Sequence, residues 1–115
     1  MEAPIPETWI KPVLRILQHG TFAREILVPE RVQRDWGSDS LGAFLWDVRD
    51  PLIKALSVPG VIGKLIIGQP EPGDTYAFWF FYGNRKFFGK ICLHRSQIKI
   101  KLLSAHHPDK GEDRL

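Results

Sequence analysis

The fold is decided by residues 76–104, which read YAFWFFYGNRKFFGKICLHRSQIKIKLLS. The first part, Tyr76–Tyr82, is apolar on both faces of an extended chain, a pattern typical of a central strand that helices cover on one side. Gly83-Asn84 is a hairpin turn signal. Residues 87–94 and 97–103 then alternate apolar and polar side chains. The stretch therefore predicts three consecutive antiparallel strands.

The last hairpin gathers lysines on one face if Arg95 and Ser96 form a tight turn. The core face would then carry Ile91, Leu93, Ile98 and Ile100. The other face would carry the opposing pairs Lys90–Lys101, Cys92–Lys99 and His94–Gln97. Like charges directly opposite each other destabilise a hairpin, so three lysines on one face indicate a surface that binds an anion. The alternative is that their long stems splay apart into water.

Upstream of the strands, apolar spacing predicts helices. Trp9–Leu17 has helical spacing, with Pro12 in the first turn and Gly20 as the end. A second short helix is expected from Pro29 to Trp36, stopped by Gly37.

The longest apolar stripe follows Asp39 or Ser40, either of which can cap a helix. Pro51 interrupts this stripe, so we expect a kink there or two helices in series. The stripe comprises Leu41, Phe44, Leu45, Val48, Leu52 and Leu56. Residues 61–67 are a short β-type run and add a fourth strand. The order predicts an α+β fold, with N-terminal helices packed on one face of a C-terminal four-stranded antiparallel sheet.

The chain of 115 residues has the length of one domain. We expect residues 1–115 to form a single domain, with residues 1–8 as a loose leader and 108–115 as a loose tail. No apolar run approaches the roughly 20 residues that cross a bilayer, so no membrane association is expected. The lone Cys92 argues against a disulfide framework and a Cys-rich zinc site. These features favour a cytoplasmic location, although a module cut from a secreted protein would look the same.

Charge is distributed unevenly along the chain. Residues 75–108 contain no Asp or Glu and carry six Lys or Arg residues, while all 13 acidic residues lie elsewhere. Such asymmetry indicates a polyanionic partner, most often a nucleic acid. The alternative is a lysine-rich solvated surface balanced by acidic helices.

The strand-end sequence Ser104-Ala105-His106 places an imidazole at the rim of this basic segment. A His of near-neutral pKa can act as base or acid when the 2′-hydroxyl of RNA attacks the adjacent phosphate. Lys and Arg can stabilise the charge on that phosphate, and Trp79, Tyr82 or Phe87 can stack a base. His106 and His107 point apart in an extended chain, with no carboxylate at ligand spacing. We therefore expect no metal and no cofactor.

The helices-then-sheet order, together with the closing sequence FFGKICLHRSQIKIKLLSAHHPDKG, resembles the barnase–EndoU–colicin E5/D–RelE-like group of metal-independent ribonucleases. This group includes the mRNA-cleaving toxins of toxin–antitoxin pairs and the nuclease tips of secreted toxins. The resemblance covers about residues 40–110 and implies catalysis on the sheet face and at strand ends. The residues it implies are Lys90, His94, Lys99, Lys101, Ser104 and His106, with Arg85 and Lys86 at the rim.

The sequence therefore predicts an endoribonuclease, the toxin of a toxin–antitoxin or toxin–immunity pair. His106 is the first candidate for the catalytic acid or base, and His107 is the alternative because one residue of register error exchanges them. Lys90, His94 and Ser104 complete the catalytic candidates. RNA contacts are expected from Arg85, Lys86, Lys99, Lys101, Arg95 and Tyr82.

The expected partners are RNA and an acidic antitoxin or immunity protein that covers the Lys90–Lys101 face. The main alternative is a non-catalytic module that holds RNA or DNA on the basic sheet. A weaker alternative is a protein–protein adaptor or antitoxin, against which the basic segment argues.

Overall fold

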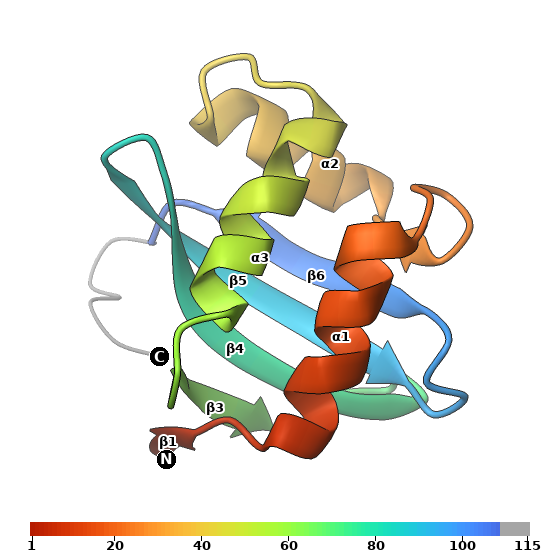
Figure 1. Cartoon of the computed structure of the whole chain (residues 1–115). Coiled ribbons are helices and arrows are strands. Elements are labelled where there is room, and N and C mark those ends of the chain that lie inside the picture. The colour runs from red at the N-terminus through yellow and green to blue at the C-terminus, as the bar shows by residue number, and fades with distance from the viewer. Residues whose placement is uncertain (109–115) are drawn as a thin grey trace.

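The computed structural model describes residues 1–108, and in them three α-helices cover one face of a six-stranded sheet (Figure 1). The helical segments are α1 (Glu7–His19), α2 (Glu30–Asp39), the 3-10 turn η1 (Leu45–Val48) and α3 (Arg49–Leu56). The strands are β1 (Glu2–Pro4), β2 (Ile26–Leu27), β3 (Ile62–Ile66), β4 (Gly73–Tyr82), β5 (Arg85–His94) and β6 (Ile100–His106). The α+β class is confirmed.

The sheet is larger than the predicted four-stranded meander. Its strand order is β1-β3-β4-β5-β6-β2, and every pair is antiparallel except β2 with β6, which is parallel. The two additional strands are only two and three residues long, so no alternating pattern marks them in the sequence. The strand β1 also corrects the loose leader, because Glu2, Ala3 and Pro4 pair with β3. Residues 109–115 of the expected loose tail lie outside the described residues.

The helices differ from their sequence patterns in extent. In α1, Pro12 lies inside the helix, one turn later than expected, because the helix begins at Glu7. The second helix runs past Gly37 to Asp39. The expected stripe from Leu41 does not form, since a loop precedes η1 and leaves Leu41 81% and Phe44 62% exposed. Only the part of the stripe from Val48 onward packs inward, and Pro51 sits in the first turn of α3, where a missing N–H is harmless.

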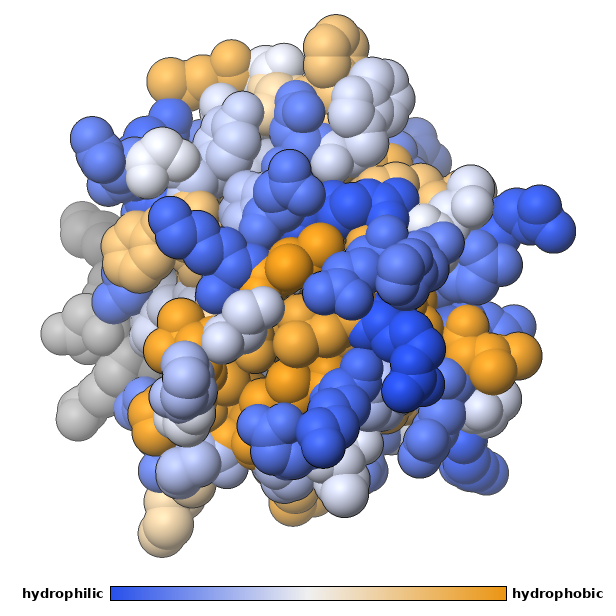
Figure 2. Space-filling model, in the orientation of Figure 1, coloured by the Kyte–Doolittle hydropathy of each residue, from blue (hydrophilic) through white to orange (hydrophobic). Residues whose placement is uncertain are grey.

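The core lies between the helices and the sheet. Trp36 of α2 packs against Phe80, Tyr82 and Phe87, with ring centroids 6.1, 5.0 and 5.2 Å away. Trp9 of α1 packs edge-on against Tyr76 at 5.1 Å. These contacts fix which face of β4 and β5 points toward the helices. On the helix side of the surface, apolar side chains gather near the middle of the view and hydrophilic residues surround them (Figure 2).

The last hairpin has a different register from the predicted one. Leu93 faces Ile100, Cys92 faces Lys101 and Ile91 faces Leu102, a shift of two residues. The turn is longer than Arg95-Ser96, because the His94 N–H donates to the Lys99 carbonyl and Gln97 takes a positive φ of 62°. The expected Lys90–Lys101 and Cys92–Lys99 pairs are therefore wrong. Ile98 is 66% exposed in the turn and is not a core residue.

Candidate nucleic-acid interface

One face of the sheet, here called the open face, lies opposite the helices. Side chains alternate along a strand, and Phe80 and Phe87 point toward Trp36. Trp79 and Phe88 therefore point the other way. The register sets Trp79 of β4 opposite Phe88 of β5, and Phe88 opposite His106 of β6. The three rings form one row across three neighbouring strands, here called the aromatic row.

The rings of the aromatic row contact one another. Trp79 and Phe88 meet edge to face with centroids 5.6 Å apart, and Phe88 and His106 lie 5.5 Å apart at an interplanar angle of 32°. All three side chains are half-buried, so each presents part of its ring to solvent. Half-exposed aromatic rings on a sheet face are the kind of surface on which unpaired bases stack.

Three lysines flank the aromatic row. Lys86 lies next to it, with its Nζ 4.1 Å from the centre of the Trp79 ring. On the other side, Ala77 of β4 faces both Lys64 of β3 and Lys90 of β5, and Lys90 faces Ser104 of β6. The open face thus brings an imidazole, a hydroxyl and three ammonium groups into adjacent rows.

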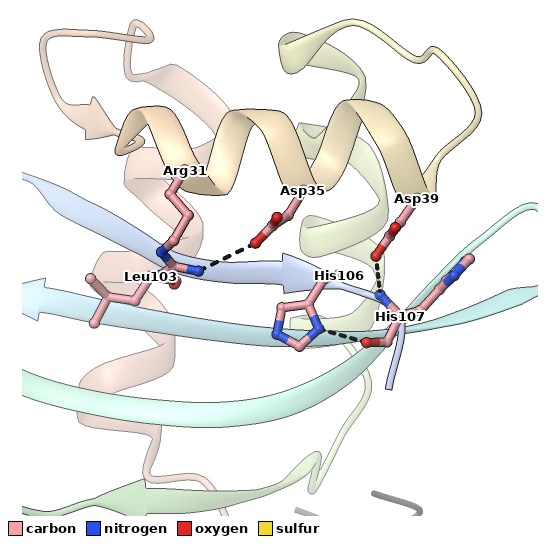
Figure 3. Close-up of polar contacts among 6 residues, drawn as sticks. All are labelled: Arg31, Asp35, Asp39, Leu103, His106 and His107. Carbon is pink, nitrogen blue, oxygen red and sulfur yellow. Dashed lines mark hydrogen bonds and ion pairs between the residues drawn. The ribbon is translucent and has the colours of Figure 1, made fainter. Parts of the chain in front are cut away.

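A β-bulge in β6 determines that the His106 side chain points to the open face. The pairing with β5 shifts between Ile91 and Lys90, which leaves Leu103 without an opposite residue. Leu102 points to the core, so an uninterrupted strand would also point Ser104 and His106 to the core. The extra residue reverses the alternation and sends both to the open face. Arg31 of α2 donates to the Leu103 carbonyl at 3.2 Å and pairs with Asp35, which secures the bulge (Figure 3).

The His106 ring is held in one tautomer. Its Nδ1 lies 2.5 Å from the backbone carbonyl of His107, which can only accept a hydrogen bond, so Nδ1 carries the proton (Figure 3). In the neutral ring, the lone pair then lies on the other nitrogen, Nε2. That is the form in which an imidazole takes up a proton as a general base.

His107, the alternative candidate, is placed for a structural role. Its ring packs on Phe87 at 4.9 Å, its Nε2 lies 2.5 Å from Nη2 of Arg85, and its N–H donates to Asp39 at 2.8 Å. Arg85 also donates to the backbone carbonyl of Asp39. The guanidinium is therefore engaged in the protein and does not line a nucleic-acid surface as expected.

Two further residues expected to contact RNA are engaged within the protein. Tyr82 points toward the helices and packs on Trp36, so it cannot stack a base on the open face. Lys101 does lie on the open face, but its Nζ donates to the carboxylate of Glu71. The distances from Nζ to Oε1 and Oε2 are 3.0 and 3.4 Å. The pair ties the loop before β4 to β6.

The thiol of Cys92 sits in the same part of the open face and is 2% exposed. Burial raises the pKa of Cys92, a shift that the Thr75 hydroxyl and Lys101 oppose and Glu71 and Asp74 strengthen. Burial therefore outweighs the opposing effect of the Lys101 ammonium group on the pKa of this thiol.

The remaining candidates lie at the far end of the hairpin. His94 ends β5, and its Nδ1 is bonded to the hydroxyl and N–H of Ser96 at 2.7 and 3.0 Å. Arg95 and Lys99 belong to the same turn. Six residues of strand separate His94 from Phe88, the residue opposite His106, which is about 20 Å. These three residues do not join the site around His106.

Sequence reasoning missed Phe88 and Lys64. Phe88 had a usable signal, because the Gly83-Asn84 turn fixes the register that sets it opposite Trp79. Lys64 had none, since its face depends on how β3 pairs with β4.

Residues 1–108 contain no group of three or more His, Cys, Asp or Glu side chains that could hold a metal ion, and no helix among them is long and apolar enough to cross a membrane. Comparison of the chain with protein-family models, with curated proteins and with solved structures found no match.

Proposed function

We propose that the chain is a metal-independent endoribonuclease that binds single-stranded RNA across the open face and cleaves it with His106. The observation that carries the proposal is the aromatic row, in which two stacking rings lie beside an imidazole whose Nε2 is free. The lysines beside the row supply the positive charge that a phosphate backbone needs. We further propose that the protein acts as a toxin, silenced by an acidic antitoxin or immunity protein that covers this face.

The reaction needs a base, charge stabilisation and an acid. His106 Nε2 takes the proton of a 2′-hydroxyl, whose oxygen attacks the adjacent phosphorus. The bond from phosphorus to the 5′-oxygen breaks, which leaves a 2′,3′-cyclic phosphate. Lys90 stabilises the charge on the phosphate, and its ammonium or water protonates the departing 5′-oxygen. Ser104, opposite Lys90, is only 6% exposed, so it supports the position of Lys90 more than it contacts the phosphate.

The test is RNA cleavage in EDTA, with detection of a 2′,3′-cyclic phosphate. His106→Asn is expected to lower kcat/KM by at least about two orders of magnitude, as loss of a general base does. His94→Asn is the matched control, because that imidazole lies at the other end of the strand, and it should keep full activity. Full activity in His106→Asn would overturn the assignment of the base.

A non-catalytic RNA-binding module is the second candidate. Within residues 1–108, the three rows around His106 contain no second imidazole, and their one carboxylate, that of Glu2, lies opposite Lys64 at the β1 edge of the sheet. The acid nearest to His106 is therefore an ammonium group or water. RNA binding that is lost in Trp79→Ala, without any strand scission by the wild type, would favour this candidate.

A further inference from the structure

A groove lies between η1–α3 and the outer edge of β4, where Trp79 of the aromatic row and Phe81 line it from the side of the open face. It has a volume of about 1210 Å³. Its most exposed apolar side chains are Trp46 at 61%, Phe81 at 58%, Val58 at 55% and Ile62 at 47%. One side of the groove, here called the helical wall, is formed by η1, α3 and the residues that follow α3. The residues of this wall that line the groove recur at steps of three and four, and they are Asp47, Asp50, Pro51, Lys54, Ala55 and Val58. So much exposed apolar surface in one groove marks an interaction site.

The strand wall of the groove is an unpaired sheet edge. β3 pairs with β4 only from Thr75 to Ala77, whereas β4 continues to Tyr82. The two-residue turn after Tyr82 makes Tyr82 and Arg85 a hydrogen-bonded pair. Pairs alternate along an antiparallel ladder, so the N–H and C=O of Phe81 point outward. Within residues 1–108 no strand lies beside Phe81, and such an edge can pair with another strand.

A twofold rotation would set the negative charges of the helical wall against the positive charge of the same wall in a second copy. Asp47 and Asp50 stand at the start of the wall and Lys54 stands near its end, and none of the three forms an ion pair within the described residues. Arg49 is turned away, because its guanidinium donates to the carbonyls of Leu17 and Gly20. A second copy in the opposite direction would set its Lys54 against Asp50.

The same rotation also sets apolar side chains against apolar side chains, and unpaired backbone groups against unpaired backbone groups, of the second copy. An axis beside Leu52 that sets Asp50 against Lys54 of the second copy also sets Trp46 against Val58 of the second copy. α3 lies beside β4 (Figure 1), and a twofold rotation reverses any direction perpendicular to its axis, so the two β4 edges meet antiparallel. Trp79 can then pair with Phe81 of the second copy. A surface that matches itself in this way is the requirement for an isologous dimer.

We propose that this groove is the interface of a twofold homodimer, in which the β4 edges pair and the α3 helices lie side by side. The interface joins two six-stranded sheets and makes the two open faces neighbours. It uses neither His106 nor the lysines of the open face. Trp79 of the aromatic row also lines the groove, but the mass of the chain in the absence of RNA tests this inference separately from the proposed function.

The first test is the mass of the purified chain by sedimentation equilibrium, without RNA, from micromolar to near-millimolar concentration. We expect twice the chain mass of 13.2 kDa. Phe81→Lys should give the monomer, because it places a charge in the groove. Ile98→Lys, at a similarly exposed apolar side chain in the distant β5–β6 turn, should leave the dimer intact. A wild type that stays monomeric throughout would overturn the proposal, as would a dimer that survives Phe81→Lys.

The second test is a charge exchange across the axis. Asp50→Lys and Lys54→Asp should each weaken dimerisation about tenfold, because each sets like charges against each other. The double exchange restores opposite charges and should restore the dimer. Circular dichroism checks that each variant is folded. Additive losses in the double variant would overturn the twofold arrangement, and the groove would then be a site for an extended segment of a different protein.

Discussion

The neighbouring residues His106 and His107 show how far chemistry depends on the direction of a side chain. His106 packs on Phe88 on the open face, whereas His107 packs on Phe87 on the helix side. Only the first is free to meet a substrate. The second completes a cluster with Arg85 and Asp39 that joins β5 and β6 to the end of α2.

His107→Ala should therefore act on stability. It removes the ring on Phe87 and the acceptor of Arg85, which should lower the free energy of unfolding by about 1–3 kcal/mol. Urea denaturation followed by tryptophan fluorescence measures the change. His106→Ala is the matched control and should cost much less, because that ring contacts only Phe88 of the neighbouring strand and bonds only to the carbonyl of the next residue. Equal losses in the two variants would contradict the different roles.

Cys92 should be inert in the folded protein. Its thiol is buried, and burial raises its pKa, so little thiolate is available to react at neutral pH. A thiol-reactive chromogenic reagent should modify it slowly in buffer and rapidly in urea. Because the pKa of the thiol is higher in the folded than in the unfolded state, its contribution to the free energy of unfolding is fully present while the thiol is protonated. That contribution is lost as the pH rises through the pKa of the folded state. Fast labelling without denaturant would contradict the burial.

The sequence predicted these residues in part. Alternation correctly assigned Lys90 to the face away from the core, and the strand-end position singled out His106. It could not separate His106 from His107, because that choice depends on one unpaired residue, Leu103. Tyr82 was predicted wrongly because a strand that is apolar on both faces gives no sign of which face meets the helices.

At the scale of elements, the link from α2 to the bulge supports the candidate site. Arg31→Met removes the donor to the Leu103 carbonyl and leaves the hydrophobic stem. We expect weaker protection of the Ala105 amide in hydrogen exchange and a several-fold loss of RNA affinity or cleavage, because Ser104 and His106 are no longer fixed in direction. Arg34→Met is the control, since Arg34 forms only a surface pair with Glu30 at 3.7 Å. Identical exchange in both variants would show that the bulge holds without α2.

The elements also show which patterns sequence can resolve. α1, β4 and the Gly83-Asn84 hairpin follow directly from periodicity and turn chemistry. The stripe from Leu41 to Leu56 looked like one helix, but its first members, Leu41 and Phe44, are exposed instead of buried. The β5–β6 register was missed by two residues because Arg95-Ser96 is a weak turn signal and the turn extends to Lys99.

At the scale of the whole molecule, the uneven charge of the sequence becomes a difference between surfaces. Of the six Lys and Arg residues in the acid-free segment, only Lys86 and Lys90 flank the aromatic row. Lys64, from outside the segment, joins them, while Glu71, also from outside it, neutralises Lys101. Charge asymmetry along the chain therefore points to the open face, but the three lysines that flank the aromatic row are not the set that the sequence singled out.

This count of lysines sets the salt dependence of RNA binding. Three lysines that contact phosphates of a single strand should give a slope of about −2 in a plot of log K against log salt. Glu71→Gln frees Lys101, so the slope should steepen by about 0.7 and the affinity at low salt should rise. Fluorescence anisotropy with a labelled single-stranded RNA measures both quantities.

Glu7→Gln is the matched control for that experiment, because it changes the net charge equally on an exposed residue of α1. If the affinity depended on the overall charge of the molecule, the two variants would change the slope by the same amount. If it depends on the lysines of the open face, only Glu71→Gln should change it, since counterions are released where phosphates are contacted. The comparison therefore separates a binding site made by four neighbouring strands from a general attraction between a basic protein and RNA.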